Sequence, residues 1–445
     1  MRKGLGGRRA RSAMLLASPP GVVLWVQIGL LSVALLALLL NSYLGPLTPL
    51  TIFAVVAAYV VLFADRLPQV AKIAWPLLLI PLLALLSVFW SPYPAATLRY
   101  GFLFLVTVFA GVMFGCGLTR TAFLKGTFLA FFIFAVLSLM LGRWVGWGAG
   151  GAAYAGLLAS KNAAGEVAGV TLIMSLAAIA WASQRKERVW LLCAWLALPI
   201  SLWLLWSSKA TGALIGSVVA STCLLLWLLS RRLPVQARIS LFIVVLVSVV
   251  ALVIAQDYWF SFIYEAVLES SGKDSGLTGR ADLWLKADSL IAARPWFGLG
   301  FNGFWVHNNL DAEYMWRMMG IKGRSGFNFH NTPREILVHL GIVGLALYAI
   351  VVGFFSVVLF SKAMVRSHVD LVLCCALWVF FAMRLPFESF GFGGMHFSSI
   401  IIFALLSLGM AAREDSGDTY PAKAGQKRVP HVGRVAAKRS VRGMA

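Results

Sequence analysis

Apolar runs long enough to cross a bilayer recur along almost the whole chain. A helix needs roughly 20 consecutive apolar residues to span the hydrocarbon core. The sequence offers about twelve such runs, near residues 21–40, 47–64, 72–90, 100–118, 122–141, 163–182, 189–206, 212–229, 237–256, 334–360, 371–387 and 396–411. Because 60% of the residues are apolar and only 12% are charged, a soluble globule is excluded. We therefore predict an all-α polytopic membrane protein with about 12 transmembrane helices.

The distribution of Lys and Arg predicts the orientation, because cytoplasmic loops retain these residues during insertion. We predict that both termini are cytoplasmic, since both are rich in basic residues. The first apolar run is too long for a signal peptide and is expected to remain as a span. The predicted order is a basic N-terminus (1–20), nine spans (21–256), one large periplasmic loop (257–333), three spans (334–411) and a disordered basic tail (412–445).

The net charge of +21 does not indicate a nucleic-acid partner. The cations are spread over loops and a low-complexity tail, and anionic headgroups of the lipid bilayer account for them more simply. The five cysteines all lie in predicted spans and have no CxxC spacing. Neither a metal site nor a disulfide framework is therefore expected.

The long loop between the ninth and tenth spans is the strongest candidate for a functional segment, because long loops on rigid scaffolds usually carry function. Its stretch GLTGRADLWLKADSLIAARP predicts an amphipathic helix that ends before Pro295. Gly298, Gly300 and Gly303 then satisfy a GxGxxG pattern. A dinucleotide site requires a preceding strand, so we predict a tight, aromatic-lined turn instead.

The motif NFHNTPRE closes this loop and predicts the start of the tenth span. Thr332 is expected to cap the helix, Pro333 to occupy the first helical position, and Glu335 to close a capping box. His330 and Asn331 would then lie at the mouth of the span. The positive end of that helix suits an anion such as a phosphate.

Four basic residues in polar motifs are predicted on the same side of the membrane: Lys161 in ASKNAAGE, Lys209 in WSSKATG, Arg280 in LTGRADLW and His330. Fixed cations can clamp a diphosphate, and a guanidinium does so through two parallel hydrogen bonds. A neutral histidine beside them could take the proton from an acceptor hydroxyl. Charge neutralisation of the leaving diphosphate would need no metal.

Each of these residues also has a purely structural interpretation. Lys161 and Lys209 could have no role beyond extending their charged groups to the membrane interface. Arg280 could pair with an acidic residue of the loop. His330 could be a polar residue beside the cap with no catalytic role. Arg384 and Glu388 are one helical turn apart and are predicted to pair with each other.

The block from GLTGRADLWLKADSLIAARPWFGLGFNGFW to FHNTPREILVHLGIVGLALY resembles the O-antigen ligase and polymerase superfamily of bacterial surface-polysaccharide assembly. LTGRADLW, GFNGFW and SKNAAGE are more similar to exopolysaccharide polymerases of the succinoglycan-production type than to ligases. The resemblance implies a multi-span membrane glycosyltransferase of the C type in the bacterial inner membrane. It also implies that the reaction occurs on the periplasmic face without cofactor or metal.

By this resemblance, His330 would be the catalytic residue and Arg280 would bind the diphosphate of an undecaprenyl-diphosphate-linked glycan. The family has an arginine where this chain has Lys209, and a lysine would supply the charge of the second phosphate contact without the fork geometry. Lys161 is a weaker candidate for the same role, and Asn331, Thr332 and Glu335 would support the site. The acceptor would be a second lipid-linked repeat unit, and a flippase and a chain-length regulator of the same pathway are the implied partners.

Three other functions remain open. A ligase would transfer the glycan to lipid A core sugar instead. A transporter or flippase would suit twelve spans, but it would use polar residues within them, and Glu166 and the Arg384/Glu388 pair are the candidates of note. A non-catalytic assembly partner would tolerate the loss of both Arg280 and His330.

Overall fold

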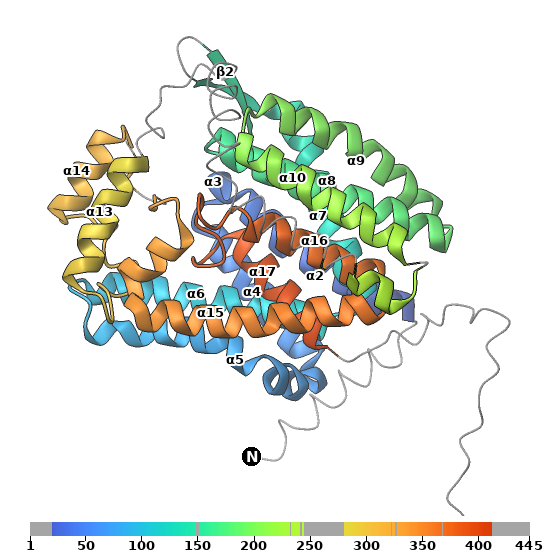
Figure 1. Cartoon of the computed structure of the whole chain (residues 1–445), viewed down its shortest axis with the longest axis horizontal. Helices are drawn as coiled ribbons and strands as arrows, with labels where there is room; N and C mark the ends of the chain where they lie inside the picture. Colours follow the sequence, from blue (N-terminus) through green and yellow to red (C-terminus); the bar gives the residue numbers. More distant parts are fainter. Residues whose placement is uncertain are drawn as a thin grey trace, which may run out of the picture. The chain divides into compact units, whose positions relative to one another are not determined.

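The computed structural model describes residues 20–147, 151–231, 233–240, 243, 280–321, 323–324, 327–366 and 368–411. The described residues leave out nearly all of the predicted cytoplasmic N-terminus and most of the ninth apolar run. They also leave out the first part of the loop and the whole predicted tail (412–445). The described chain is mostly helical (Figure 1).

A helix lies at each of the eleven other predicted runs, and the described residues 237–240 of the ninth run are also helical. The helices are α2 (Pro20–Leu39), α3 (Asn41–Leu44), α4 (Leu47–Leu62), α5 (Leu67–Leu86), α6 (Pro94–Gly117), α7 (Arg120–Leu141), α8 (Lys161–Arg185), α9 (Arg188–Ser207), α10 (Thr211–Ser230), α13 (Arg280–Ala293), α14 (Leu310–Met318), α15 (Thr332–Arg366), α16 (Val369–Ala382) and α17 (Phe397–Met410), with short 3-10 turns η1 (Ala64–Arg66) and η2 (Ser87–Phe89).

Length and composition identify a multi-pass membrane protein. Within the described residues, seven helices are long and apolar enough to cross a membrane, or eight if the bent pair Leu47–Leu62 and Ala64–Ile73 forms one span. Trp75–Phe89, α16 and α17 are shorter apolar helices. The number of twelve spans therefore stays a prediction.

The prediction that the chain is all-α is wrong at one place. Strands β1 (Arg143–Trp147) and β2 (Gly151–Gly156) form an antiparallel hairpin between α7 and α8. Trp144 packs edge-to-face against Tyr154, whose hydroxyl donates to the Ser138 carbonyl at the end of α7. Aromatic and β-branched residues favour a strand here, and cross-strand contacts of this kind stabilise short hairpins.

The helices differ in how completely they are buried. α17 is buried on nearly all sides and packs against α6 and α15, while α16 packs against α8 and α10. A helix that is apolar all round belongs inside a bundle. By contrast, α9 and α10 bury little of their surface, as expected of helices that face lipid.

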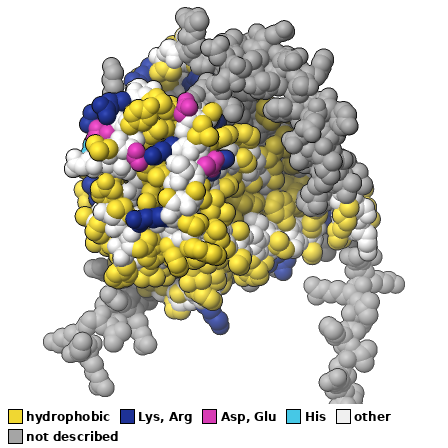
Figure 2. All heavy atoms as spheres, turned by 60° about the vertical axis from the view of Figure 1, so that its left-hand side comes forward, with side chains coloured by type: hydrophobic (Ala, Val, Ile, Leu, Met, Phe, Trp, Pro, Cys, Tyr) yellow, Lys and Arg dark blue, Asp and Glu magenta, His cyan; other side chains and the backbone are white. Residues whose placement is uncertain are grey.

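The described part of the long loop has a hydrophobic core of its own. α13 and α14 lie side by side (Figure 1), and Leu283, Trp316 and Phe329 are buried between them and the start of α15. Figure 2 shows charged side chains gathered over this part of the surface, with hydrophobic side chains over most of the rest of the face. Ion pairs link these charges: Lys286–Asp311, Arg324–Glu313 and Arg334–Asp288.

A break in α15 anchors the loop to the helical bundle. Gly341 has φ 65°, and this conformation interrupts the helix. Backbone groups on either side of Gly341 therefore lack partners within the helix. The segment after α13 supplies partners. The amides of Leu299 and Gly300 donate to the carbonyls of Val338 and His339. In the other direction, the amides of Ile342 and Val343 donate to the carbonyls of Pro295 and Trp296. This turn contains the glycines of the GxGxxG pattern, so the prediction of a tight turn is confirmed.

Candidate functional site

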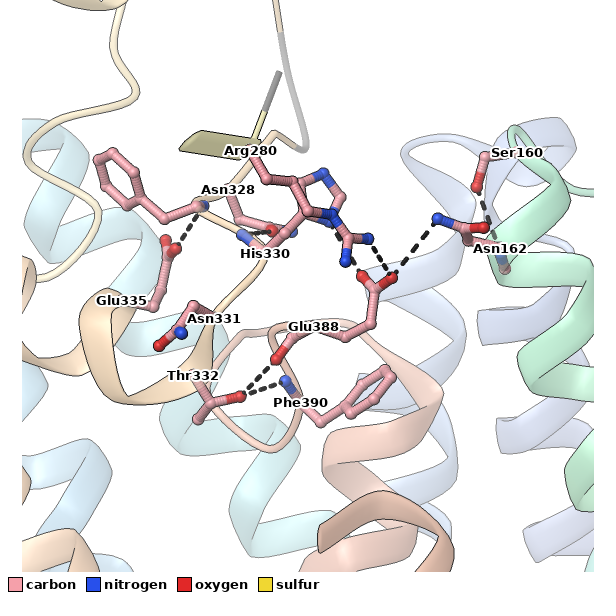
Figure 3. A network of polar contacts seen from close by, with 12 residues as sticks. Ser160, Asn162, Arg280, Asn328, His330, Asn331, Thr332, Glu335, Glu388 and Phe390 are labelled. Carbon is pink, nitrogen blue, oxygen red and sulfur yellow. Dashed lines mark hydrogen bonds and ion pairs between the residues drawn. The ribbon is translucent and has the colours of Figure 1, made fainter. Parts of the chain in front are cut away.

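The carboxylate of Glu388 holds Arg280 and His330 together (Figure 3). Glu388 lies between α16 and α17, Arg280 begins α13, and His330 precedes α15. Nη2 of Arg280 lies 2.8 Å from Oε1 of Glu388, and Nδ1 of His330 lies 2.9 Å from Oε2. Asn162, in the first turn of α8, approaches Oε1 with its Nδ2 at 3.4 Å. Four segments that are distant in sequence therefore meet at one carboxylate.

This contact assigns different tasks to the two ring nitrogens of His330. A carboxylate acceptor favours the tautomer that carries the proton on Nδ1. Nε2 is then the nitrogen with a free lone pair, and it has no hydrogen-bond partner among the described residues. The side chain is 27% exposed, so Nε2 is available to a bound hydroxyl. An imidazole held in this way can act as a general base.

The electrostatic environment keeps Glu388 charged. Burial alone would raise its pKa, but the hydrogen bond from His330 and the nearby positive charges, Arg280 and Arg384 among them, together outweigh burial. The pKa of Glu388 therefore lies below its ordinary value. An ionised Glu388 can stabilise the imidazolium that forms when His330 accepts a proton.

The turn before α15 presents His330 to the site. His330 adopts the left-handed conformation, with φ 49°, and its amide donates to Oδ1 of Asn328 at 2.8 Å. This conformation is uncommon for residues other than glycine but is enriched for histidine and asparagine. Glu335 reaches back to accept the Phe329 amide at 2.7 Å. The two residues that precede the histidine are thereby tied to it and to α15.

The helix cap differs from the predicted one. Asn331, rather than Thr332, caps α15: its Oδ1 accepts the Arg334 amide at 2.9 Å. Thr332 is the first helical residue, and its hydroxyl donates to the Glu388 carbonyl and accepts from the Phe390 amide. The prediction placed the cap one residue too late, because Asn and Thr are both good caps and only the tertiary contact distinguishes them.

The three predicted supporting residues all contact the segments that hold His330 and Glu388. Asn331 donates through Nδ2 to the Pro386 carbonyl at 2.8 Å, in addition to capping α15. The Thr332 hydroxyl joins the helix to the Glu388 carbonyl and to the Phe390 amide through the bonds given above. These contacts attach the 385–390 segment to the N-terminus of α15.

The two lysines form a separate pair. Lys161 begins α8, next to Asn162, and its ammonium donates to the Lys209 carbonyl at 3.1 Å. Lys209 has φ 51°, and its ammonium lies 5.3 Å from the centre of the Trp206 ring. The structure thus brings Arg280 and His330 into direct contact with one acid, and it connects the lysines to that acid through the first turn of α8.

Sequence reasoning missed the role of Glu388. The prediction that Arg384 pairs with Glu388 is wrong: the Arg384 guanidinium lies against Phe380 and Phe390, while Arg280 and His330 occupy the carboxylate. α16 ends at Ala382, so a pairing rule for regular helices does not apply. The purely structural interpretation of Arg280 predicted a pair with an acid of the loop. Its partner is instead Glu388, which follows α16.

The fold and the site define a multi-pass membrane protein with a carboxylate-held histidine and arginine near the ends of several helices. Residues 195–349 match a family described as O-antigen ligase. The chain is also 30% identical over 270 residues, or 60% of its length, to the exopolysaccharide production protein ExoQ of Rhizobium meliloti (strain 1021). These two matches confirm the resemblance to the O-antigen ligase and polymerase family.

The extent of each match limits what it covers. The alignment spans 61% of the length of the curated relative, about three fifths of that protein. The family match contains Lys209, Arg280 and His330, whereas Asn162 and Glu388 lie outside it. The contacts of these two residues therefore come from the structure alone.

Proposed function

We propose that this protein is a polysaccharide polymerase that joins undecaprenyl-diphosphate-linked saccharide repeat units on the periplasmic face of the inner membrane. One observation carries the proposal: a single carboxylate, 16% exposed, orients a histidine through Nδ1 and also holds an arginine at 2.8 Å. The similarity to an exopolysaccharide production protein supports the choice of a polysaccharide as product.

In the proposed reaction, Nε2 of His330 takes the proton from a hydroxyl of the acceptor repeat unit. The acceptor oxygen forms a bond to the anomeric carbon of the donor sugar as the bond from that carbon to the diphosphate oxygen breaks. The electron pair of the broken bond leaves with undecaprenyl diphosphate. The reaction needs no oxidant or reductant, and the imidazolium later returns its proton to solvent.

Arg280 is proposed to bind the leaving diphosphate. Only its Nη2 is bonded to Glu388, so its other N–H groups can face phosphate oxygens. Lys209 and Lys161 would add positive charge from the neighbouring ends of α8 and α10, with Lys209 as a point charge where the family has the fork of an arginine. Fixed cations around a developing diphosphate stabilise the transition state without reorganisation.

Purified full-length protein supplied with lipid-linked repeat units, extracted from a strain that lacks this gene, tests the proposal. We expect elongation in the presence of EDTA and loss of elongation in His330→Ala. His307→Ala is the matched control. His307 belongs to the same loop, and its one ring contact among the described residues is with Trp316. Full elongation by His330→Ala would exclude the mechanism.

A ligase is the second candidate, because the matching family is described as O-antigen ligase. It would use the same base and the same donor but transfer the glycan to lipid A core sugar. Offering both acceptors to one preparation distinguishes the two activities. A deletion strain gives the same distinction: single repeats left on the carrier indicate a polymerase, and free polymer with bare lipid A core indicates a ligase.

A further inference from the structure

A second buried arginine lies behind the site. Arg384 is 5% exposed, and its guanidinium lies 4.9 Å from the centre of the Phe380 ring and 4.8 Å from that of Phe390. Its Nε and Nη1 atoms have no hydrogen-bond partner among the described residues. Burying a guanidinium with unsatisfied donors is costly, so a residue of this kind calls for a functional reason.

A simple structural ion pair does not explain Arg384. The buried acid that could pair with it is Glu166, on α8, which is 4% exposed and has an unpaired Oε1. Within the described residues the two side chains form no ion pair within 4.0 Å. The two charges therefore influence each other only at longer range.

The backbone connects Arg384 to Glu388 directly. The Glu388 amide donates to the Arg384 carbonyl at 2.8 Å. Phe390, whose ring covers the guanidinium, donates its amide to the Thr332 hydroxyl, which itself donates to the Glu388 carbonyl. Arg384, Glu388 and the turn that carries His330 are thus joined by short bonds, and the charge of Arg384 helps to lower the pKa of Glu388.

Glu388 faces charged groups from several elements: Arg280 from α13, His330 from the turn before α15, and Arg384 from its own segment, with Glu166 of α8 farther off. Arg280 is the one that the proposed function assigns to the diphosphate. When Arg280 shares its charge with phosphate oxygens, Glu388 keeps full neutralisation only if another cation stays in place. Arg384, enclosed by two aromatic rings, is such a cation.

We propose that Arg384 is a positioning residue: it keeps Glu388 ionised and fixed while Arg280 turns to the diphosphate, so that His330 stays correctly oriented. This inference rests on the proposed function. It differs from a role in packing because it concerns charge, and a change in charge alters the dependence of the rate on pH.

The test measures kcat and KM against pH for the full-length protein, with lipid-linked repeats extracted from the deletion strain as substrate. In Arg384→Gln we expect kcat to fall by about tenfold to a hundredfold, by analogy with the outer partners that orient the ligands of a metal site. KM for the donor should change little. Removing a positive charge makes protonation of the Glu388–His330 pair easier, so the acid limb of the profile should move to higher pH. Arg384→Lys should restore much of the wild-type profile.

A double variant separates this role from a balance with Glu166. If Arg384 served only to neutralise Glu166, Glu166→Gln/Arg384→Gln would regain the wild-type pH profile, and the inference would be overturned. We expect the acid limb to stay shifted. The double variant also removes both buried charges, so it provides the measurement if Arg384→Gln alone does not fold. A wild-type profile in Arg384→Gln while His330→Ala is inactive would remove this inference and leave the proposed function intact, whereas an active His330→Ala would remove both.

Discussion

The exchange of Glu388 for glutamine tests the centre of the site. Glutamine has nearly the same shape but no charge, and its one carbonyl oxygen can replace only one of the two carboxylate oxygens. One of these accepts from Arg280 and Asn162, and the other from His330. If the amide oxygen faces Arg280, its NH₂ group faces Nδ1 of His330. His330 then turns to the tautomer with the proton on Nε2, which cannot act as a base.

The size of the effect follows from the bond that is lost. The bond from Nδ1 to Oε2 is 2.9 Å long, and a hydrogen bond to a charged group contributes about 1.5–3 kcal/mol. Since about 1.4 kcal/mol corresponds to a tenfold change in rate, losing this bond in the transition state lowers kcat by about 10- to 150-fold. Arg280 keeps a neutral acceptor in place of the charged one and stays available for the proposed contact with phosphate, so KM for the donor should not rise.

The assay is elongation of extracted lipid-linked repeats by the purified variant. Glu388→Asp, which keeps the charge on a shorter side chain, is the matched control and should lose less activity than Glu388→Gln. Thermal unfolding in detergent shows whether each variant is folded. A folded Glu388→Gln that elongates at the wild-type rate would refute the assignment of Glu388 as the residue that orients His330.

Three further predictions concern stability. The pKa of Glu388 is lowered in the folded state, so its ionisation stabilises the fold fully above the ordinary pKa of 4.5. This stabilisation is lost as pH falls through the lower pKa of the folded state. Tm should therefore drop more steeply at acid pH for wild type than for Glu388→Gln. Gly341→Ala would place a Cβ 2.3 Å from the Trp296 backbone at a positive φ and should lower Tm, whereas Gly353→Ala, in open space on the same helix, should not. Asn331→Ala should cost about 0.5–2 kcal/mol of unfolding free energy, and Asn331→Asp, which keeps the cap acceptor, should cost less.

The helical part of the fold was predictable because its signal is local. Each apolar run carries enough hydrophobic length to specify a helix without reference to the others. The hairpin gave no comparable signal, since RWVGW and GAAYAG are short and contain glycine. Its strands depend on packing against the end of α7 and on Trp203 of α9, and such contacts between distant residues cannot be read from a short window.

Arg280 and His330 were named as candidates from their motifs, but the residue that joins them was not. Glu388 is 108 residues from Arg280 and 58 from His330 in sequence. The nearest basic residue in sequence, Arg384, suggested a local pair, and local spacing was the wrong guide at the end of a helix. Asn162 was missed for a similar reason, because its neighbour Lys161 was the more conspicuous residue in the same motif.

The way the loop is held argues that the site is formed before substrate binds. The segment after α13 is bonded to the break at Gly341 through four backbone hydrogen bonds, and Arg334 holds Asp288 through two more contacts. Trp284 also donates to the Phe329 carbonyl, beside His330. Because α13 is fixed to α15 along this length, Arg280 and His330 keep their separation without a ligand. A diphosphate bound as proposed would meet groups already in position, and such preorganisation avoids the entropic cost of assembling them during the reaction.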